Sequence, residues 1–184
     1  MIYLQYLSLS SFVSVGRVLI KAGDGTGVRH LYYFDGSRIA VSVFSILSRL
    51  SGVKFEKLRF EMMNVRDSKG ELVRLRIPRE DLFGIENAIT QSRICGMVFE
   101  ELKNNGRLSQ FVIKTILDGF INSDPASISR LLYIINVVRL HTCSENVGRC
   151  VLIIPDHPWF SFLKAYANEI GVTLVPAWIG FGVV

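Results

Sequence analysis

The sequence has few of the residues that build covalent or metal cross-links. Its three cysteines, Cys95, Cys143 and Cys150, include no CxxC pair. An odd number of cysteines without that spacing does not indicate a disulfide framework. Cys143, Cys150 and nearby His141 offer three ligand candidates, whereas structural zinc uses four. We therefore expect free thiols in a reducing compartment, with no metal and no cofactor.

The sequence also lacks the long apolar runs of membrane proteins. No uncharged stretch reaches the roughly 20 residues of a transmembrane helix. Residues 1–16 lack the basic start of a signal peptide and predict a strand. The mean hydropathy of +0.34 is nevertheless high for a free-standing domain. This indicates either an extensively buried α/β sheet or an apolar surface that a partner covers. We expect a cytoplasmic protein. The alternative is a cytoplasmic protein that contacts the inner membrane peripherally.

Familiar catalytic motifs are missing as well. The sequence contains no Ser-His-Asp order, HExxH, P-loop or DxD-like acidic pair. One glycine-rich segment, Gly23–Gly27, lies between two predicted strands, 16–22 and 30–34. A phosphate-binding loop would run directly into a helix. A surface loop or hairpin therefore fits this segment better. The sequence as a whole contains no complete set of catalytic residues.

The charge is concentrated in one segment. The formal net charge is +5, and the whole excess lies between Arg49 and Arg79. Alternating apolar and charged residues predict a β-hairpin over about 53–78, turning at Ser68-Lys69, with Met62 opposite Leu75. Its basic outer face would be solvated. Interleaved glutamates and the lack of exposed aromatic residues argue against nucleic-acid binding.

The clearest pattern in the chain is a strand–helix–strand unit over about 150–178. Val151–Ile154 reads as a buried strand, and Pro155–Pro158 ends it. Asp156 or His157 would cap the next helix, which Gly171 would end before a second strand at Val172–Val175. Such a βαβ unit predicts a mostly parallel, Rossmann-like open sheet. The fold class expected for 1–184 is a single α/β domain.

Two helical regions complete the expected organisation. After a strand at Leu31–Phe34, a helix follows that Gly52 closes, and its apolar residues fall on one face: Ile39, Val43, Ile46, Leu47 and Leu50. A helical insertion is expected over about 79–141, with Pro78 at its start. Within it, Ile128–Leu140 is apolar nearly all round, which predicts deep burial.

Five residues are candidates for ligand contacts. Asp35, Ser37 and Arg38 follow a strand and open a helix, the place where open α/β sheets bind ligands. Asp35 or Ser37 also suits a helix N-cap. His157 and Trp159 lie at the next strand-to-helix turn and could offer a hydrogen bond and a stacking plane to a sugar. The structural alternative is that Asp156 caps this helix and Trp159 packs on the sheet.

The YYFDGSR turn, the basic ribbon, the helical insertion and the IIPDHPWF…YANEIGV unit together resemble a known family. This is the amino-terminal half of bacterial surface-carbohydrate glycosyltransferases of the two-lobed GT-B type. The resemblance implies an acceptor-binding lobe in polysaccharide biosynthesis, since the other lobe holds the sugar nucleotide. It implies a saccharide acceptor and a second lobe or partner chain, because two lobes need about 300 residues. No catalytic residue carries over. The alternative is a non-catalytic α/β module that docks on a partner protein or membrane face.

Overall fold

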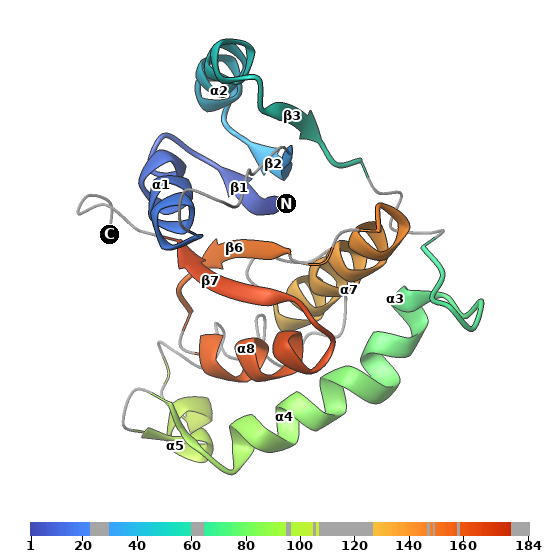
Figure 1. Cartoon of the computed structure of the whole chain (residues 1–184). Helices are drawn as coiled ribbons and strands as arrows, with labels where there is room; N and C mark the ends of the chain where they lie inside the picture. The colour runs from blue at the N-terminus through green and yellow to red at the C-terminus, as the bar shows by residue number, and fades with distance from the viewer. Residues whose placement is uncertain are drawn as a thin grey trace. The chain divides into compact units, whose positions relative to one another are not determined.

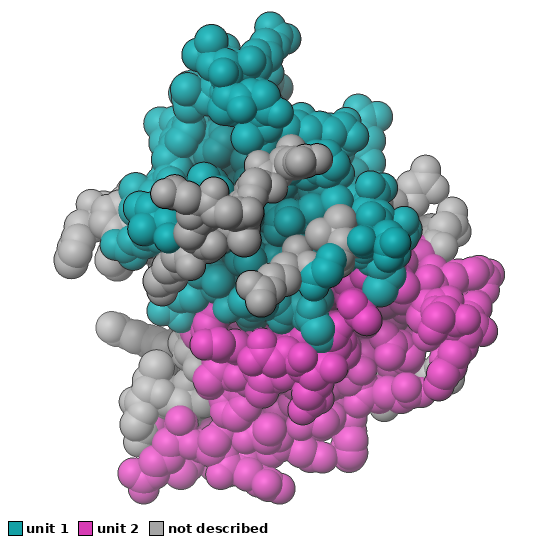
Figure 2. Space-filling model, in the orientation of Figure 1, with its two compact units in different colours: residues 1–59, 141–156, 171–184 teal, residues 60–140, 157–170 magenta. Residues whose placement is uncertain are grey.

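The computed structural model describes residues 1–22, 30–59, 65–94, 97–104, 106, 127–146, 148, 150–157 and 159–177. The chain divides into two compact units, coloured separately in Figure 2. Unit 1 comprises residues 1–59, 141–156 and 171–184, and unit 2 comprises residues 60–140 and 157–170. Neither unit is one continuous stretch of sequence. The expectation of a single domain stays a prediction.

Unit 1 is built on a five-stranded sheet (Figure 1). Its strand order is β3-β2-β1-β6-β7, and every neighbouring pair is parallel. The strands are β1 (Ile2–Leu7), β2 (His30–Gly36), β3 (Lys54–Lys57), β6 (Val151–Pro155) and β7 (Thr173–Ala177). The central strand β1 is apolar and buried over most of its length, as strands covered on both faces are. The structure confirms the expected α/β fold with a Rossmann-like open sheet.

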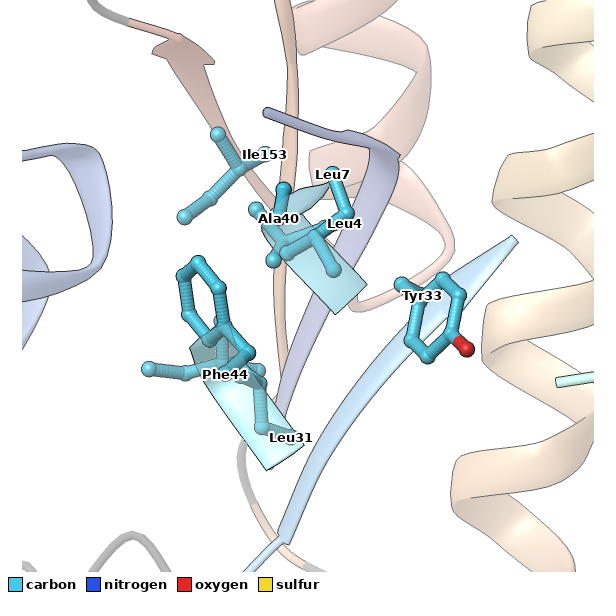
Figure 3. Packing of buried hydrophobic residues seen from close by; sticks show 8 residues of the cluster. Leu4, Leu7, Leu31, Tyr33, Ala40, Phe44 and Ile153 are labelled. Carbon is cyan, nitrogen blue, oxygen red and sulfur yellow. The ribbon is translucent and has the colours of Figure 1, made fainter. Parts of the chain in front are cut away.

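Two helices of unit 1, α1 (Ser11–Ala22) and α2 (Arg38–Ser51), share one hydrophobic core with the sheet. Figure 3 shows this core at close range. The rings of Phe12 and Phe44 stack with centroids 4.0 Å apart, which brings the two helices together. The buried members of the core are Ile2, Leu4, Leu7, Leu31, Tyr33, Ala40, Phe44 and Ile153. Phe12, Val15 and Val18 of α1 pack against them.

The first strand is shorter than predicted. Residues 1–16 do not form one strand and 16–22 do not form a second, because β1 ends at Leu7 and α1 begins at Ser11. The inward residues Phe12, Val15 and Val18 recur at helical spacing, so packing overrides the strand preference of the β-branched residues. The segment 23–29 lies outside the described residues.

Helix α2 occurs where it was expected, and its apolar stripe points away from the core. Ser37 is its N-cap, and Gly52 ends it with a φ of 69°. Only Ala40 and Phe44 of this helix are buried. The apolar residues that share the other face are largely exposed, with relative exposures of 69% for Ile39, 59% for Ile46 and 79% for Leu50. The prediction of the helix is confirmed, and the side that packs into the core is the one with Ala40 and Phe44.

The β-hairpin predicted over about 53–78 does not form as expected. Lys54–Lys57 is β3, which pairs in parallel with β2, and Val73–Arg76 is a short helix, α3. The turn at Ser68-Lys69 exists, closed by a hydrogen bond from Gly70 N to Asp67 O at 2.9 Å. Met62 lies outside the described residues. Beside this turn, Arg66 and Leu72 form an isolated antiparallel bridge. A longer antiparallel pair of unit 2 joins β4 (Arg93–Ile94) and β5 (Met97–Val98).

The described part of unit 2 is mainly helical. One helical run comprises α3, the π-helical η1 (Ile77–Asp81) and α4 (Leu82–Thr90), and α5 spans Phe99–Asn104. This run begins at Val73, before the predicted start at Pro78. Pro78 lies in η1, consistent with the missing N–H that disturbs a regular α-helical ladder.

Two further helices confirm sequence expectations. Helix α7 (Ile128–Ser144) is buried along most of Ile128–Val138, as its apolar sequence predicts. Its residues up to 140 belong to unit 2 and the remainder to unit 1. Helix α8 (Phe160–Glu169) follows β6 in sequence, and Gly171 follows it with a φ of 80°. Neither Asp156 nor His157 is the N-cap of α8, which is Trp159. Within the described segments, no helix is long and apolar enough to cross a membrane.

Candidate functional site at the carboxyl ends of β1 and β2

The candidate site begins where β1 and β2 end side by side. Tyr6 pairs with Asp35 and Leu7 pairs with Gly36 in the parallel register. Ser37 N then donates a hydrogen bond to Leu7 O at 3.0 Å. A Cβ at position 36 would lie 2.7 Å from Leu7 Cβ and 3.0 Å from Leu7 O. Glycine therefore lets the two strand ends approach closely, and the polar residues that follow each strand become neighbours.

Three serines follow β1. Ser8 Oγ lies 2.7 Å from Ser10 Oγ and 3.2 Å from Ser11 Oγ. Ser8 N donates to Ser11 Oγ at 2.9 Å, while Ser11 N donates to Ser8 O at 3.1 Å. These bonds order the start of α1 and gather three hydroxyl groups there. The prediction of one strand over residues 1–16 does not single these serines out, although Ser-x-Ser-Ser before an apolar helical pattern is a recognisable helix-start signal.

The residues after β2 are those that the sequence singled out. Asp35 is exposed, and its Oδ1 accepts a hydrogen bond from Gly36 N at 2.9 Å. Ser37 Oγ accepts from Ala40 N at 3.2 Å and so caps α2. Arg38 is exposed in the first turn of that helix. Asp35, Ser37 and Arg38 thus lie at the end of β2 and the start of α2, next to the end of β1 that Ser8 follows.

The strand order explains why this edge suits a ligand. The chain proceeds from β1 outward to β2 and β3, and later returns to place β6 and β7 on the other side of β1. The strand order reverses at β1, and open α/β sheets bind ligands outside the carboxyl ends of the strands at such a point. β6 ends at the same edge with Pro155, followed by exposed Asp156. The site offers hydroxyl groups, carboxylates and one guanidinium.

The remaining two candidate residues lie in unit 2. The rings of His157 and Trp159 stack with centroids 5.4 Å apart and an interplanar angle of 9°. Trp159 is only 1% exposed, so its ring is part of a packed interior. Asp35, Ser37 and Arg38 belong to unit 1. Convergence of all five residues on one cleft stays a prediction, and stacking of a sugar on Trp159 would require the ring to become accessible.

Unit 2 contains a separate polar network. Arg76 forms ion pairs with Asp67 (Nε–Oδ2 3.7 Å) and Asp81 (Nη2–Oδ2 3.6 Å), and its Nη2 donates to Asn136 Oδ1 at 2.6 Å. Asn136 Nδ2 donates to Tyr166 Oη at 2.8 Å. Burial raises the pKa of Tyr166 to about 12. The network joins α3, η1, α7 and α8, which indicates a role in holding these helices together.

A second polar group lies at the amino ends of the strands in unit 1. Tyr3 Oη lies 2.9 Å from His141 Nδ1 and 3.2 Å from Thr142 Oγ1. The rings of Tyr3 and Tyr32 stack with centroids 5.3 Å apart. Burial raises the pKa of Tyr3 to about 12 and lowers the pKa of His141. This group fastens the last turn of α7 to the sheet, at the edge opposite to the candidate site.

Among the described residues, no group of three or more His, Cys, Asp and Glu side chains is placed to hold a metal ion. Comparisons with protein-family models, with curated proteins and with solved structures find no match. The candidate site therefore has to be interpreted from its own chemistry.

Proposed function

We propose that unit 1 binds a saccharide acceptor at the carboxyl ends of β1 and β2. The observation that carries the proposal is the close approach of Leu7 and Gly36, which places the end of β1, followed by Ser8, next to the end of β2, followed by Ser37. Carboxylates and guanidinium groups form charge-assisted hydrogen bonds with hydroxyl groups, and serine hydroxyls can both donate and accept. This set of groups suits a polyhydroxylated ligand.

The wider role that we propose is that of an acceptor-side lobe in a glycosyltransferase-like protein of surface polysaccharide biosynthesis. The resemblance in sequence and the Rossmann-like sheet support this role. A second lobe or partner chain would supply the sugar nucleotide and complete catalysis. The proposed location is the cytoplasm, with peripheral contact at the inner membrane.

Saccharide binding by the purified chain tests the proposal. Saturation-transfer NMR with a panel of bacterial oligosaccharides should show binding that Asp35→Asn and Arg38→Gln each weaken about tenfold or more, since each removes a charge-assisted hydrogen bond. Arg139→Gln, which changes an exposed arginine of α7, is the matched control and should bind as the wild type does. Calorimetry with sugar nucleotides should show no micromolar binding. Equal saccharide binding by all variants would refute the site, and tight nucleotide binding would refute the acceptor role.

A non-catalytic docking role is the second candidate function. The exposed apolar stripe of α2 favours it, because an amphipathic helix normally buries its larger apolar face. Docking and acceptor binding use different residues of unit 1 and can be tested separately.

A further inference from the structure

The outer faces of α1 and α2 are unusually apolar for surface helices. On α2, Ile39, Ile46, Leu47 and Leu50 are exposed and recur at helical spacing. At the start of α1 and along it, Leu9, Val13, Leu19 and Ile20 are exposed, and Ile20 reaches 82%. Most exposed large apolar side chains of the described residues fall within these two helices and Leu9. We call these eight residues the apolar face of unit 1.

The apolar face is a consequence of how the two helices pack. Phe12, Val15 and Val18 of α1 and Ala40 and Phe44 of α2 already fill the core against the sheet. The Phe12–Phe44 ring stack brings the helices together over one face of that sheet. Their outward apolar residues are therefore surplus to the core of unit 1. Clustered exposed apolar residues mark an interaction surface more often than singly scattered ones do.

The charges on these helices have one sign only. Neither Ser11–Ala22 nor Arg38–Ser51 contains an aspartate or glutamate. Arg17 and Arg49 are exposed, and Lys21 also belongs to α1. The remaining polar positions are mostly serine. Apolar residues flanked by basic ones and short hydroxyl side chains are typical of helices that lie in a membrane interface.

This charge pattern decides between two occupants. A symmetric dimer through α1 and α2 would set arginines of one copy near arginines of the other, with no acidic residue in either helix to pair with them. An anionic lipid surface carries the negative charge that neither helix contains, and it accepts the apolar side chains as well. We infer that the apolar face of unit 1 docks on an anionic phospholipid bilayer. This inference rests on the docking function proposed above and is independent of saccharide binding.

Vesicle co-sedimentation of the full chain tests the inference. The protein should sediment with vesicles of phosphatidylcholine containing about 30% phosphatidylglycerol, and far less with phosphatidylcholine alone. Two variants address the two contributions. Arg17→Glu with Arg49→Glu should weaken binding about fivefold or more per arginine and reduce its salt dependence. Ile20→Ser with Ile46→Ser and Leu50→Ser should abolish binding at every salt concentration, because the apolar anchor is lost.

Matched controls come from unit 2. Leu75→Ser with Phe83→Ser removes two other exposed apolar residues, and Arg93→Glu with Arg139→Glu reverses two other exposed arginines. Both controls should bind vesicles as the wild type does. Equal binding to neutral and anionic vesicles, or no binding to either, would overturn the inference. A dimer detected by sedimentation equilibrium and dissociated by the Ile46→Ser and Leu50→Ser changes would also overturn the inference. Oligosaccharide binding retained by the vesicle-defective variants would separate this surface from the acceptor site.

Discussion

Gly36 shows how one residue shapes the candidate site. A side chain there would overlap Leu7, since its Cβ would lie 2.7 Å from Leu7 Cβ. Gly36→Ala should therefore force β1 and β2 apart and lower the free energy of unfolding by about 1–3 kcal/mol. Gly84→Ala is the control, because a Cβ at this position in α4 meets nothing within 4 Å. It should raise that free energy by about 0.5–1 kcal/mol.

Urea denaturation of both glycine variants measures the two effects. If Gly36→Ala were as stable as the wild type, the contact between Leu7 and Gly36 would be looser than the structure shows. The polar groups on either side of it would then have no fixed spacing, and the proposed saccharide site would lose its geometric basis.

His141 makes stability depend on pH. Burial, the largest cause, lowers its pKa below the ordinary value of 6.5, while Glu145 and Glu56 oppose this effect. The unfolded chain thus binds a proton below pH 6.5 more readily than the folded protein does, and the free energy of unfolding falls as the pH falls through that value. His141→Gln should flatten this part of the dependence.

Denaturation between about pH 5.5 and 7.5 covers the relevant window. Asp81 acts with the opposite sign and at lower pH, because burial raises its pKa above the ordinary value of 3.8. An unchanged slope in His141→Gln would mean that His141 binds its proton equally in the folded and unfolded chain.

At the level of elements, the buried strands and helices were the predictable part. Val151–Pro155 and Ile128–Ser144 are apolar enough to have few alternatives, and both occur as expected. The same holds for the turn Asp35–Arg38, because a polar cluster between an apolar strand and a periodic helix has a clear signature. These elements were sufficient to identify the parallel sheet and half of the candidate site.

The hairpin prediction was wrong over residues 73–77 because the spacing of the apolar residues there fits both a strand and a helix. Val73, Leu75 and Ile77 alternate with arginines, as in a strand. In the structure, Val73 and Ile77 are four residues apart on one buried side of a helical run, and Leu75 is exposed. In helix α2, which formed as predicted, the sequence offers two apolar sides, and the side with Ala40 and Phe44 is the one that packs into the core. Sequence periodicity alone does not decide such cases; three-dimensional packing does.

The N-cap of α2 links this element to the candidate site. Ser37→Ala removes the hydrogen bond to Ala40 N and should lower the free energy of unfolding by about 0.5–2 kcal/mol. Ser42→Ala is the control, because Ser42 lies inside the same helix and only bonds back to Arg38 O. It should change stability by less than about 0.5 kcal/mol. Thermal unfolding of both variants measures the difference, and equal stability would show that the cap contributes nothing.

At the level of the whole molecule, both units are assembled from separate parts of the sequence. Unit 1 combines residues 1–59 with 141–156 and 171–184, and unit 2 fills the intervals. The candidate saccharide site and the apolar face both lie in unit 1, whereas the Arg76 network lies in unit 2. Mutations can therefore change the binding surfaces of unit 1 without changing the Arg76 network that holds the helices of unit 2 together. For this reason the control variants for vesicle binding are placed in unit 2.

The central position of β1 also bears on how the chain is made. Strands β1, β2 and β3 leave the ribosome early, but β6, which pairs with the other edge of β1, follows only after residues 60–140 have been made. Until then, one edge of a very apolar strand keeps unpaired backbone groups that can recruit other strands. Pairings between distant segments also form slowly. The nascent chain is therefore expected to depend on chaperone protection during synthesis and to aggregate when it is produced faster than chaperones can bind it.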